Sequence, residues 1–342
     1  MSRRLLHITL FATGLLATSW LIRAADRLPF WSLTRPNAAA LEARIDEVDT
    51  LFLGSSRIYR GINPIVFDAQ MAALGAPTSS FNMGQPGTKM YDTCRVVDWL
   101  LARRPAKLAR VFIEIDSYVT HSRSSHWMSR LMIETHEPSH FAARLRSVLL
   151  TSRPVLVKLE LIGFAAAHTI VNALRIGQGV RILDDWCRHW SGQAPSRFEP
   201  MPERGFEPLG PTSRLSEQRR SQHEEWRAEP DAAAELLSQK RANPIPAYAR
   251  GGFDRESFLD QTRALEAAGI EVVYVIMPSY AVHLQGRDGV EEILDQATVL
   301  SFEDPDEYAE LYEFDHCFDQ GHMVRSGAEL FSRLLARTYA GR

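Results

Sequence analysis

Short apolar runs alternate with helical patterns in two parts of this chain. The runs have the length and composition of buried strands and lie at residues 48–53, 80–84, 108–115, 271–278 and 298–302. Helical spacing predicts helices at 63–75, 88–102, 254–268 and 325–339, and a short one at 289–295. Strands separated by helices form parallel sheets with both faces covered. The pattern therefore predicts a three-layer α/β/α fold around a mostly parallel, five-stranded sheet.

The N-terminal segment has a different pattern. Arg3 and Arg4 precede the apolar stretch 5–22, which at about 18 residues is just long enough to cross a bilayer. Arginines before the span favour a cytoplasmic N-terminus. Residues 1–27 are therefore predicted to be a signal anchor and 28–46 a linker, with the α/β domain (47–342) in the periplasm or outside the cell. A cleaved signal peptide is the alternative, since 17–19 and 22–24 resemble processing sites.

The alternation breaks between residues 120 and 247, which indicates an insertion that is largely helical and partly mobile. Residues 154–176 have a helical pattern, and 161–174 are almost wholly apolar. That apolar section is short and is flanked by Lys158, Glu160 and Arg175, so a buried or interfacial helix is favoured over a second membrane span. Residues 193–246 are rich in Pro, Arg and Glu, which is typical of an exposed segment.

Composition excludes several classes of function. A net charge of -3 gives no electrostatic basis for nucleic-acid binding. The three cysteines are too widely spaced for a zinc motif or a dense disulfide framework. Four histidines (121, 126, 136 and 140) lack a convincing ligand spacing, and no phosphate-binding or nucleotide motif is present. We therefore expect no metal and no cofactor.

Two segments at opposite ends of the chain contain residues suited to nucleophilic catalysis. Gly54-Ser55-Ser56 follows the first predicted strand, and Asp319 and His322 lie shortly before the last helix. At the carboxyl edge of the sheet, Ser56 could act as nucleophile, His322 as base and Asp319 as the group that orients the imidazole. His316 is a second histidine close to this segment, but its spacing from the last helix is different, so it is a weaker candidate for the base than His322. The alternative is that the serines cap a turn, Asp319 caps the helix and His322 is a surface residue.

These residues resemble the sequence blocks of the SGNH/GDSL hydrolase superfamily. The chain is most similar to its membrane-anchored envelope branch, which includes the D-alanyl transfer protein of teichoic acid and alginate O-acetylation proteins. Residues 54–57 match the first block, Gly-Asp-Ser-x, and Asp319 and His322 match the last, Asp-x-x-His. The resemblance covers residues 47–118 and 252–340 and implies that the Gly84 N–H helps to form an oxyanion hole.

The third block of that family is missing. Where an oxyanion-donating asparagine is expected after the third strand, this chain has Glu114-Ile115-Asp116-Ser117. The resemblance then leaves the N–H groups of Ser56 and Gly84, assisted by Asn82, as oxyanion donors. Arg57 and Asp116 are candidate substrate contacts, although Arg57 could instead pair with a surface acid.

The expected function is that of a membrane-tethered serine acyl hydrolase or O-acyltransferase. Its partners would be an envelope glycan, an acyl donor and, by resemblance, a multi-spanning membrane acyltransferase, with residues 5–22 in the inner membrane. Two alternatives remain open at this stage. One is a catalytically degenerate, glycan-binding scaffold of a polysaccharide assembly complex, and the other is a secreted, lipase-like esterase.

Overall fold

The computed structural model groups the chain into two compact units. It describes residues 3–25, 35–87, 93–115, 133, 135–150, 153–176, 187, 191, 204–210, 217–242, 255–280 and 297–342. One unit comprises residues 1–36, 121–149 and 153–199, and the other comprises 37–120, 150–152 and 200–342. The second part of the predicted insertion therefore belongs to the same unit as the predicted α/β domain.

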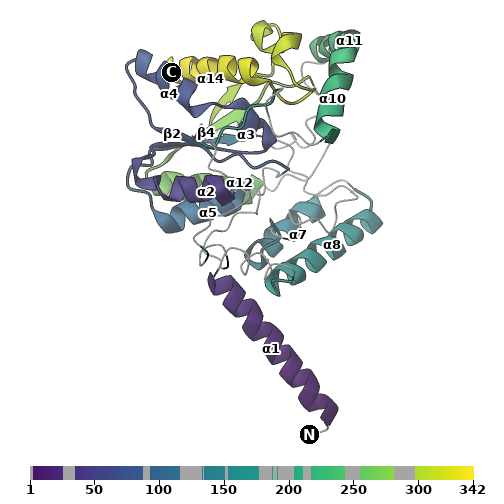
Figure 1. Cartoon of the computed structure of the whole chain (residues 1–342). Helices are drawn as coiled ribbons and strands as arrows, with labels where there is room; N and C mark the ends of the chain where they lie inside the picture. The colour runs from purple at the N-terminus through teal and green to yellow at the C-terminus, as the bar shows by residue number, and fades with distance from the viewer. Residues whose placement is uncertain are drawn as a thin grey trace. The chain divides into compact units, whose positions relative to one another are not determined.

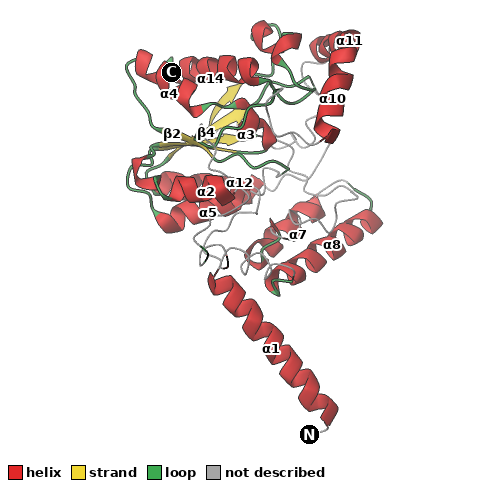
Figure 2. Cartoon of the chain, viewed as in Figure 1, coloured by secondary structure: helices red, strands yellow, loops and turns green. Residues whose placement is uncertain are grey.

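The larger unit is built on a five-stranded sheet in which every strand pairs in parallel (Figures 1 and 2). The strand order is β2-β1-β3-β4-β5. The strands are β1 (Thr50–Leu53), β2 (Ser80–Asn82), β3 (Arg110–Glu114), β4 (Glu271–Ile276) and β5 (Thr298–Ser301). The predicted α/β class and the five strands are confirmed, and the sheet is wholly parallel rather than mostly so.

Helices cover both faces of the sheet (Figure 1). The helices α4 and α14 pack against each other on one face, and α5 and α12 on the other. Their bounds are α2 (Arg35–Glu42), α3 (Ser56–Gly61), α4 (Pro64–Ala73), α5 (Thr93–Arg103), α12 (Arg255–Ala267) and α14 (Arg325–Ala340). The first five residues of the predicted helix 88–102 and the whole of the predicted helix 289–295 lie outside the described residues.

Aromatic side chains fill the layer between the sheet and α4. Phe52 of β1, Phe112 of β3 and Phe67 of α4 are fully buried, and their ring centroids lie 5.0 to 5.6 Å apart. Buried apolar area of this kind is the main favourable contribution to folding. Because adjacent strands contribute to the same cluster, the cluster fixes the position of the carboxyl edge of the sheet.

The direction in which successive strands are added to the sheet reverses at β1. The connection from β1 leads to β2 on one side, and the chain then returns to β3 on the other side. In doubly wound parallel sheets, a crevice forms outside the carboxyl ends of the strands at such a switch point. The residues that follow β1 and β3 therefore lie where an open α/β protein usually holds its ligand.

The segment predicted to be exposed, 193–246, contains two helices that pack against the core of the larger unit. They are α10 (Glu217–Ala228) and α11 (Pro230–Ala242). Trp226 and Ala233 from these helices are buried in the main hydrophobic cluster. A low density of large apolar residues led to the expectation of exposure, but a few well-placed ones are enough to dock a helix.

The smaller unit contains the N-terminal helix and two helices from the first part of the insertion. These are α1 (Arg3–Ala25), α7 (Phe141–Leu150) and α8 (Val155–Ala173). By length and composition, α1 could be a signal sequence or a membrane anchor, and α8 passes the same test with a lower hydropathy. Within this unit the Ser19 Oγ donates a hydrogen bond to the Leu174 carbonyl oxygen (2.7 Å), which joins α1 to the end of α8.

Candidate active site

The two serines after β1 have different environments. Ser55 is the N-cap of α3, and its Oγ accepts a hydrogen bond from the Arg57 N–H (3.2 Å). Ser56 is the first helical residue and is only partly buried. The turn-capping role that the sequence left open therefore belongs to Ser55, and the hydroxyl of Ser56 is left to face the site.

The predicted triad residues lie within hydrogen-bonding distance of one another. The Ser56 Oγ is 2.8 Å from Nε2 of His322, although 266 residues separate them in the chain. Nδ1 of His322 lies 2.8 Å from Oδ1 and 3.0 Å from Oδ2 of Asp319. This is the order nucleophile, base and orienting carboxylate that acyl transfer through a serine requires.

Asp319 is held in its ionised form. Burial raises the pKa of its carboxyl, but the hydrogen bond and charge of His322 and the N–H groups of Gly321 and His322 together lower it below its usual value. An ionised carboxylate accepts a hydrogen bond from the Nδ1–H of His322, which leaves Nε2 as the acceptor for the Ser56 hydroxyl. The tautomer required of a general base follows from this arrangement.

The predicted oxyanion donors Asn82 and Gly84 are engaged elsewhere. The Asn82 side-chain amide donates to the carbonyl oxygens of Ile58 and Ile62, both at 2.7 Å, and its oxygen accepts the Gly84 N–H at 2.9 Å. These bonds fasten α3 to the end of β2. In this structure Asn82 and Gly84 therefore support the helix that carries Ser56, and they do not offer a free donor to an oxyanion.

Gly84 is required at its position for a steric reason. A Cβ built on it would lie 2.3 Å from the backbone nitrogen of Tyr59 in α3. Any side chain would push α3 away from β2. The glycine that the resemblance assigned to catalysis thus has a packing role as well.

The Ser56 N–H remains as a predicted oxyanion donor. It lies in the first turn of α3, where backbone N–H groups have no acceptor within the helix. The positive end of the helix dipole lies at the same place. Among the donors named from the sequence, it is therefore the one that its helix leaves without an acceptor and so suits a developing negative charge on a substrate at Ser56.

Arg57 points inward and pairs with Glu114 at the end of β3. Its Nε donates to Oε1 of Glu114 at 2.7 Å, while Oε2 of Glu114 accepts the Ser55 N–H at 2.5 Å. Glu114 is almost fully buried and Arg57 nearly so. The acid that the sequence left open as a partner for Arg57 is thus a buried one, and Arg57 is not placed on an open surface. Asp116, the other candidate contact, lies outside the described residues.

Sequence reasoning missed the role of Glu114. Two hydrogen bonds of its carboxylate go to the residues on either side of Ser56, so it fixes the backbone that carries the nucleophile. Gly54 accommodates this carboxylate, because a Cβ at Gly54 would lie 2.5 Å from Oε2 of Glu114. An acid at the end of a buried apolar strand was the signal that could have drawn attention to it.

Helix α10 contacts the loop that carries Asp319 and His322. Arg219 Nη1 lies 3.4 Å from Oδ2 of Asp319, and Nδ1 of His223 lies 2.8 Å from the Phe318 carbonyl oxygen. The His223 ring stacks on Phe318 with 4.3 Å between centroids. Arg227 pairs with Asp315 at 2.5 Å.

These α10 residues were also missed from the sequence. Arg219, His223 and Arg227 are spaced by four, so they lie on one face of the helix. That basic spacing could have been recognised, but its partners in the loop could not.

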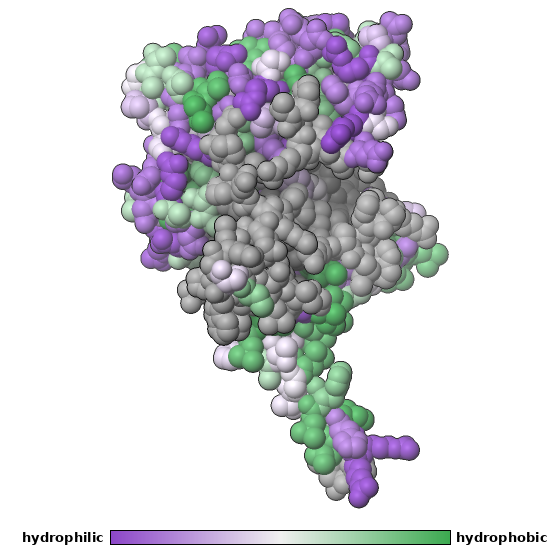
Figure 3. Space-filling view, viewed as in Figure 1, coloured by the Kyte–Doolittle hydropathy of each residue, from purple (hydrophilic) through white to green (hydrophobic). Residues whose placement is uncertain are grey.

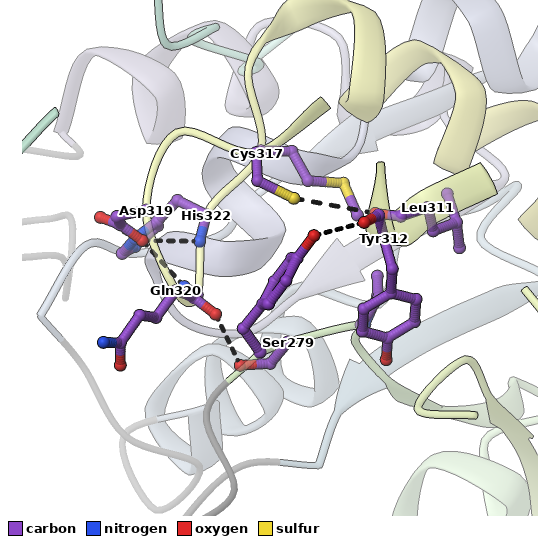
Figure 4. Close-up of a pocket in the computed structure, with 11 residues that line it drawn as sticks. Ser279, Leu311, Tyr312, Cys317, Asp319, Gln320 and His322 are labelled. Atoms are coloured by element: carbon purple, nitrogen blue, oxygen red, sulfur yellow. Dashed lines mark hydrogen bonds and ion pairs between the residues drawn. The ribbon is translucent and has the colours of Figure 1, made fainter. Parts of the chain in front are cut away.

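A small pocket lies beside His322 (Figure 4). Around it the Ser279 Oγ and the Tyr280 N–H both donate to the Gln320 carbonyl oxygen, at 3.0 and 2.8 Å. Cys317 is buried next to it, and burial raises the pKa of its thiol to about 12, which keeps it protonated. The bonds to Gln320 hold the turn between Asp319 and His322 in place. The full lining is Pro278, Ser279, Tyr280, Leu311, Tyr312, Cys317, Asp319, Gln320, Gly321, His322 and Met323.

His316, the alternative base, faces another direction. Its Nδ1 lies 2.8 Å from the Glu310 carbonyl oxygen. The described residues contain no group of three or more metal-binding side chains. Of the four histidines in the insertion, His121 and His126 lie outside the described residues, and the ring of His136 packs against that of His168 at 4.8 Å.

Comparisons with protein-family models, with curated proteins and with solved structures found no match to this chain.

Proposed function

We propose that this chain is a serine acyl hydrolase or O-acyltransferase of SGNH type that acts on a cell-envelope glycan. The observation that carries the proposal is the hydrogen-bonded series Ser56–His322–Asp319 at the carboxyl edge of a parallel sheet. Three polar groups of these types in this order have a direct use in acyl transfer. The SGNH fold and the glycan substrate rest on the resemblance in the sequence blocks.

The chemistry follows from the arrangement of the three side chains. The Ser56 Oγ attacks the carbonyl carbon of an ester while Nε2 of His322 accepts the hydroxyl proton. Asp319 stabilises the imidazolium that forms, and the Ser56 N–H donates to the oxyanion. Collapse of this intermediate expels the alcohol, which takes the proton from His322. The acyl group then passes from Ser56 to water or to a sugar hydroxyl, with His322 acting again as base.

Tethering to the inner membrane through α1 is part of the proposal. An anchored site faces the periplasm or cell exterior and stays close to a membrane-bound acyl donor, a membrane acyltransferase or a growing polymer. An anchored chain stays with the membrane fraction at alkaline pH, whereas a cleaved signal releases a shorter, soluble chain.

A fluorophosphonate probe tests the nucleophile without knowledge of the substrate. The probe phosphonylates a serine that a base activates, so we expect it to label the wild-type chain and not Ser56→Ala. His322→Ala should slow labelling by about a hundredfold or more, because the base is lost. Equal labelling of the wild-type chain and Ser56→Ala would refute the assignment.

A non-catalytic scaffold is the second candidate, and a specific observation favours it. Asn82 and Gly84 are engaged in holding α3, and the loss of one oxyanion donor costs about a hundredfold or more in rate. A folded wild-type chain that binds glycan but reacts no faster with the probe than His322→Ala would support the scaffold over the enzyme.

A further inference from the structure

The helix pair α7–α8 has its polar side chains inside. Arg144 and Ser147 of α7 and His168 and Asn172 of α8 are all at most 4% exposed. The Arg144 Nη2 donates to the Thr135 carbonyl oxygen at 2.9 Å. Asn172 Nδ2 likewise donates to a carbonyl oxygen, that of residue 133, at 2.8 Å. Polar side chains therefore share the buried side of these helices with the apolar side chains of Val148, Leu161 and Ala165.

The outer face of the same pair is apolar. Leu156 is 79% exposed and Val155 70%, and Leu149, Leu159 and Ile170 are each more than half exposed. In a protein surrounded by water, a surface helix turns its apolar side chains inward and its polar ones outward. The reverse arrangement is characteristic of protein in contact with lipid, where polar groups face one another and apolar groups face the surroundings.

The charges around this face are mainly basic. Between residues 141 and 176 the charged side chains that are exposed or partly exposed are Arg146, Arg153, Lys158 and Arg175, with Glu160 as the only acid. A helix with an apolar face and nearby basic residues suits the headgroup region of an anionic membrane. Lys158 in addition donates to the Leu149 carbonyl oxygen at 2.8 Å, at the end of α7.

The position of α8 beside α1 identifies the surface that would cover it. The hydrogen bond from Ser19 to the Leu174 carbonyl oxygen holds the end of α8 against the last third of α1. Apolar side chains are also exposed along α1, most of which is green in Figure 3. If α1 is inserted in a bilayer, the C-terminal end of α8 therefore lies at the same level in the membrane as Ser19.

We propose that the α7–α8 pair lies in the headgroup–acyl boundary of an anionic phospholipid membrane, with Leu156, Leu159 and Ile170 facing the lipid. Lys158 and Glu160 interrupt the apolar stretch, which favours an interfacial position over a second span. This inference rests on the anchoring of α1 in the proposed function, but not on any reaction at Ser56. It gives the chain two contacts with the membrane, one through α1 and one through the surface of α7–α8.

Site-directed fluorescence of the full chain in lipid nanodiscs tests this inference. A polarity-sensitive fluorophore is attached to Leu156→Cys or Ile170→Cys in a Cys187→Ser background, since Cys94 and Cys317 are buried. Ser238→Cys, on an exposed position of α11, is the matched control. The discs contain phosphatidylglycerol and a lipid that carries a nitroxide quencher near the headgroup, and circular dichroism verifies that each variant is folded.

We expect the nitroxide lipid to quench a fluorophore at residue 156 or 170 at least threefold more than one at residue 238. The quenching at 156 and 170 should be weaker in discs in which phosphatidylcholine replaces phosphatidylglycerol and the nitroxide lipid is kept. Quenching of 156 and 170 that matches 238 would overturn the proposal. A fluorophore at residue 156 or 170 that reports an apolar environment but is not quenched by the nitroxide lipid would also overturn the proposal, since a second protein copy would then cover the face. Equal quenching in the two lipids would overturn the preference for an anionic surface.

Discussion

At the scale of single residues, Ser56 owes its position to the groups around it. Glu114 accepts hydrogen bonds from the backbone of the residue before Ser56 and from the side chain of the residue after it, while Asn82 binds two carbonyl oxygens at the end of α3. None of these contacts is local in sequence. They suit a nucleophile whose position relative to its base must be kept constant to within a fraction of an ångström.

Glu114→Gln tests how much the Arg57–Glu114 pair stabilises the fold. The change leaves a buried guanidinium without its counter-charge, so we expect the free energy of unfolding in urea to fall by about 3 kcal/mol or more. Glu329→Gln is the matched control, because Glu329 pairs with Arg325 on the surface of α14 at 3.5 Å. The control should change stability by less than about 1 kcal/mol. A Glu114→Gln chain as stable as the control would contradict this account of the ion pair.

At the scale of elements, helix α10 contributes to the site although it lies within the predicted insertion. It is fixed to the core by Trp226, whose ring stacks on Phe314 with 5.5 Å between centroids. This leaves its basic face directed at the Asp319 loop. The helix therefore supports the loop that carries the base of the triad.

Arg219→Gln tests whether α10 helps to orient Asp319. Loss of the contact to Oδ2 of Asp319 should lower the rate constant for fluorophosphonate labelling of Ser56 by roughly threefold to tenfold, equivalent to about 1 kcal/mol. Trp226, His223 and Arg227 keep α10 docked, so the unfolding transition should change little. Arg219→Lys should recover much of the rate, and Arg220→Gln on the neighbouring, exposed position should match the wild type. An unchanged rate in Arg219→Gln, in a wild-type chain that the probe does label, would remove this role and leave the triad intact.

At the scale of the whole molecule, the stability of the fold depends on the ionisation of Asp319. The pKa of this carboxyl is below its usual value in the folded chain, so the folded state binds a proton less readily than the unfolded chain. The resulting stabilisation is fully present above the ordinary aspartate pKa of 3.8 and is lost as pH falls through the lower folded value.

We therefore expect the free energy of unfolding to decline below about pH 4, with part of that decline absent from Asp319→Asn. Titration of one proton corresponds to a slope of up to about 1.4 kcal/mol per pH unit. Chemical denaturation at a series of pH values measures the difference. Asp260→Asn, on the exposed face of α12, should retain the wild-type pH dependence, and an Asp319→Asn chain with the full acid decline would contradict the ionised carboxylate.

The pattern of hydrophobic and polar positions by itself determined the five strands of this fold and several of the helices beside them. Strands and helices follow from side-chain period, which is local, and the five strands and the helices around residues 64–73, 255–267 and 325–340 were predicted on that basis. The candidate residues Ser56, Asp319 and His322 were also named from sequence. Their pairing at 2.8 Å depends on the tertiary structure, because it needs the strand register and the docking of α14 across 266 residues.

Only the tertiary structure decided which polar groups satisfy one another. Glu114 was read as a departure from a family block, and the structure makes it the partner of Ser55 and Arg57. The side-chain amide of Asn82 was expected to donate to the substrate oxyanion, whereas in the structure it donates to the carbonyl oxygens of Ile58 and Ile62. Hydrogen bonds depend on distance and angle between groups far apart in the chain. A residue's type limits what it can bind, and only the fold determines what it meets.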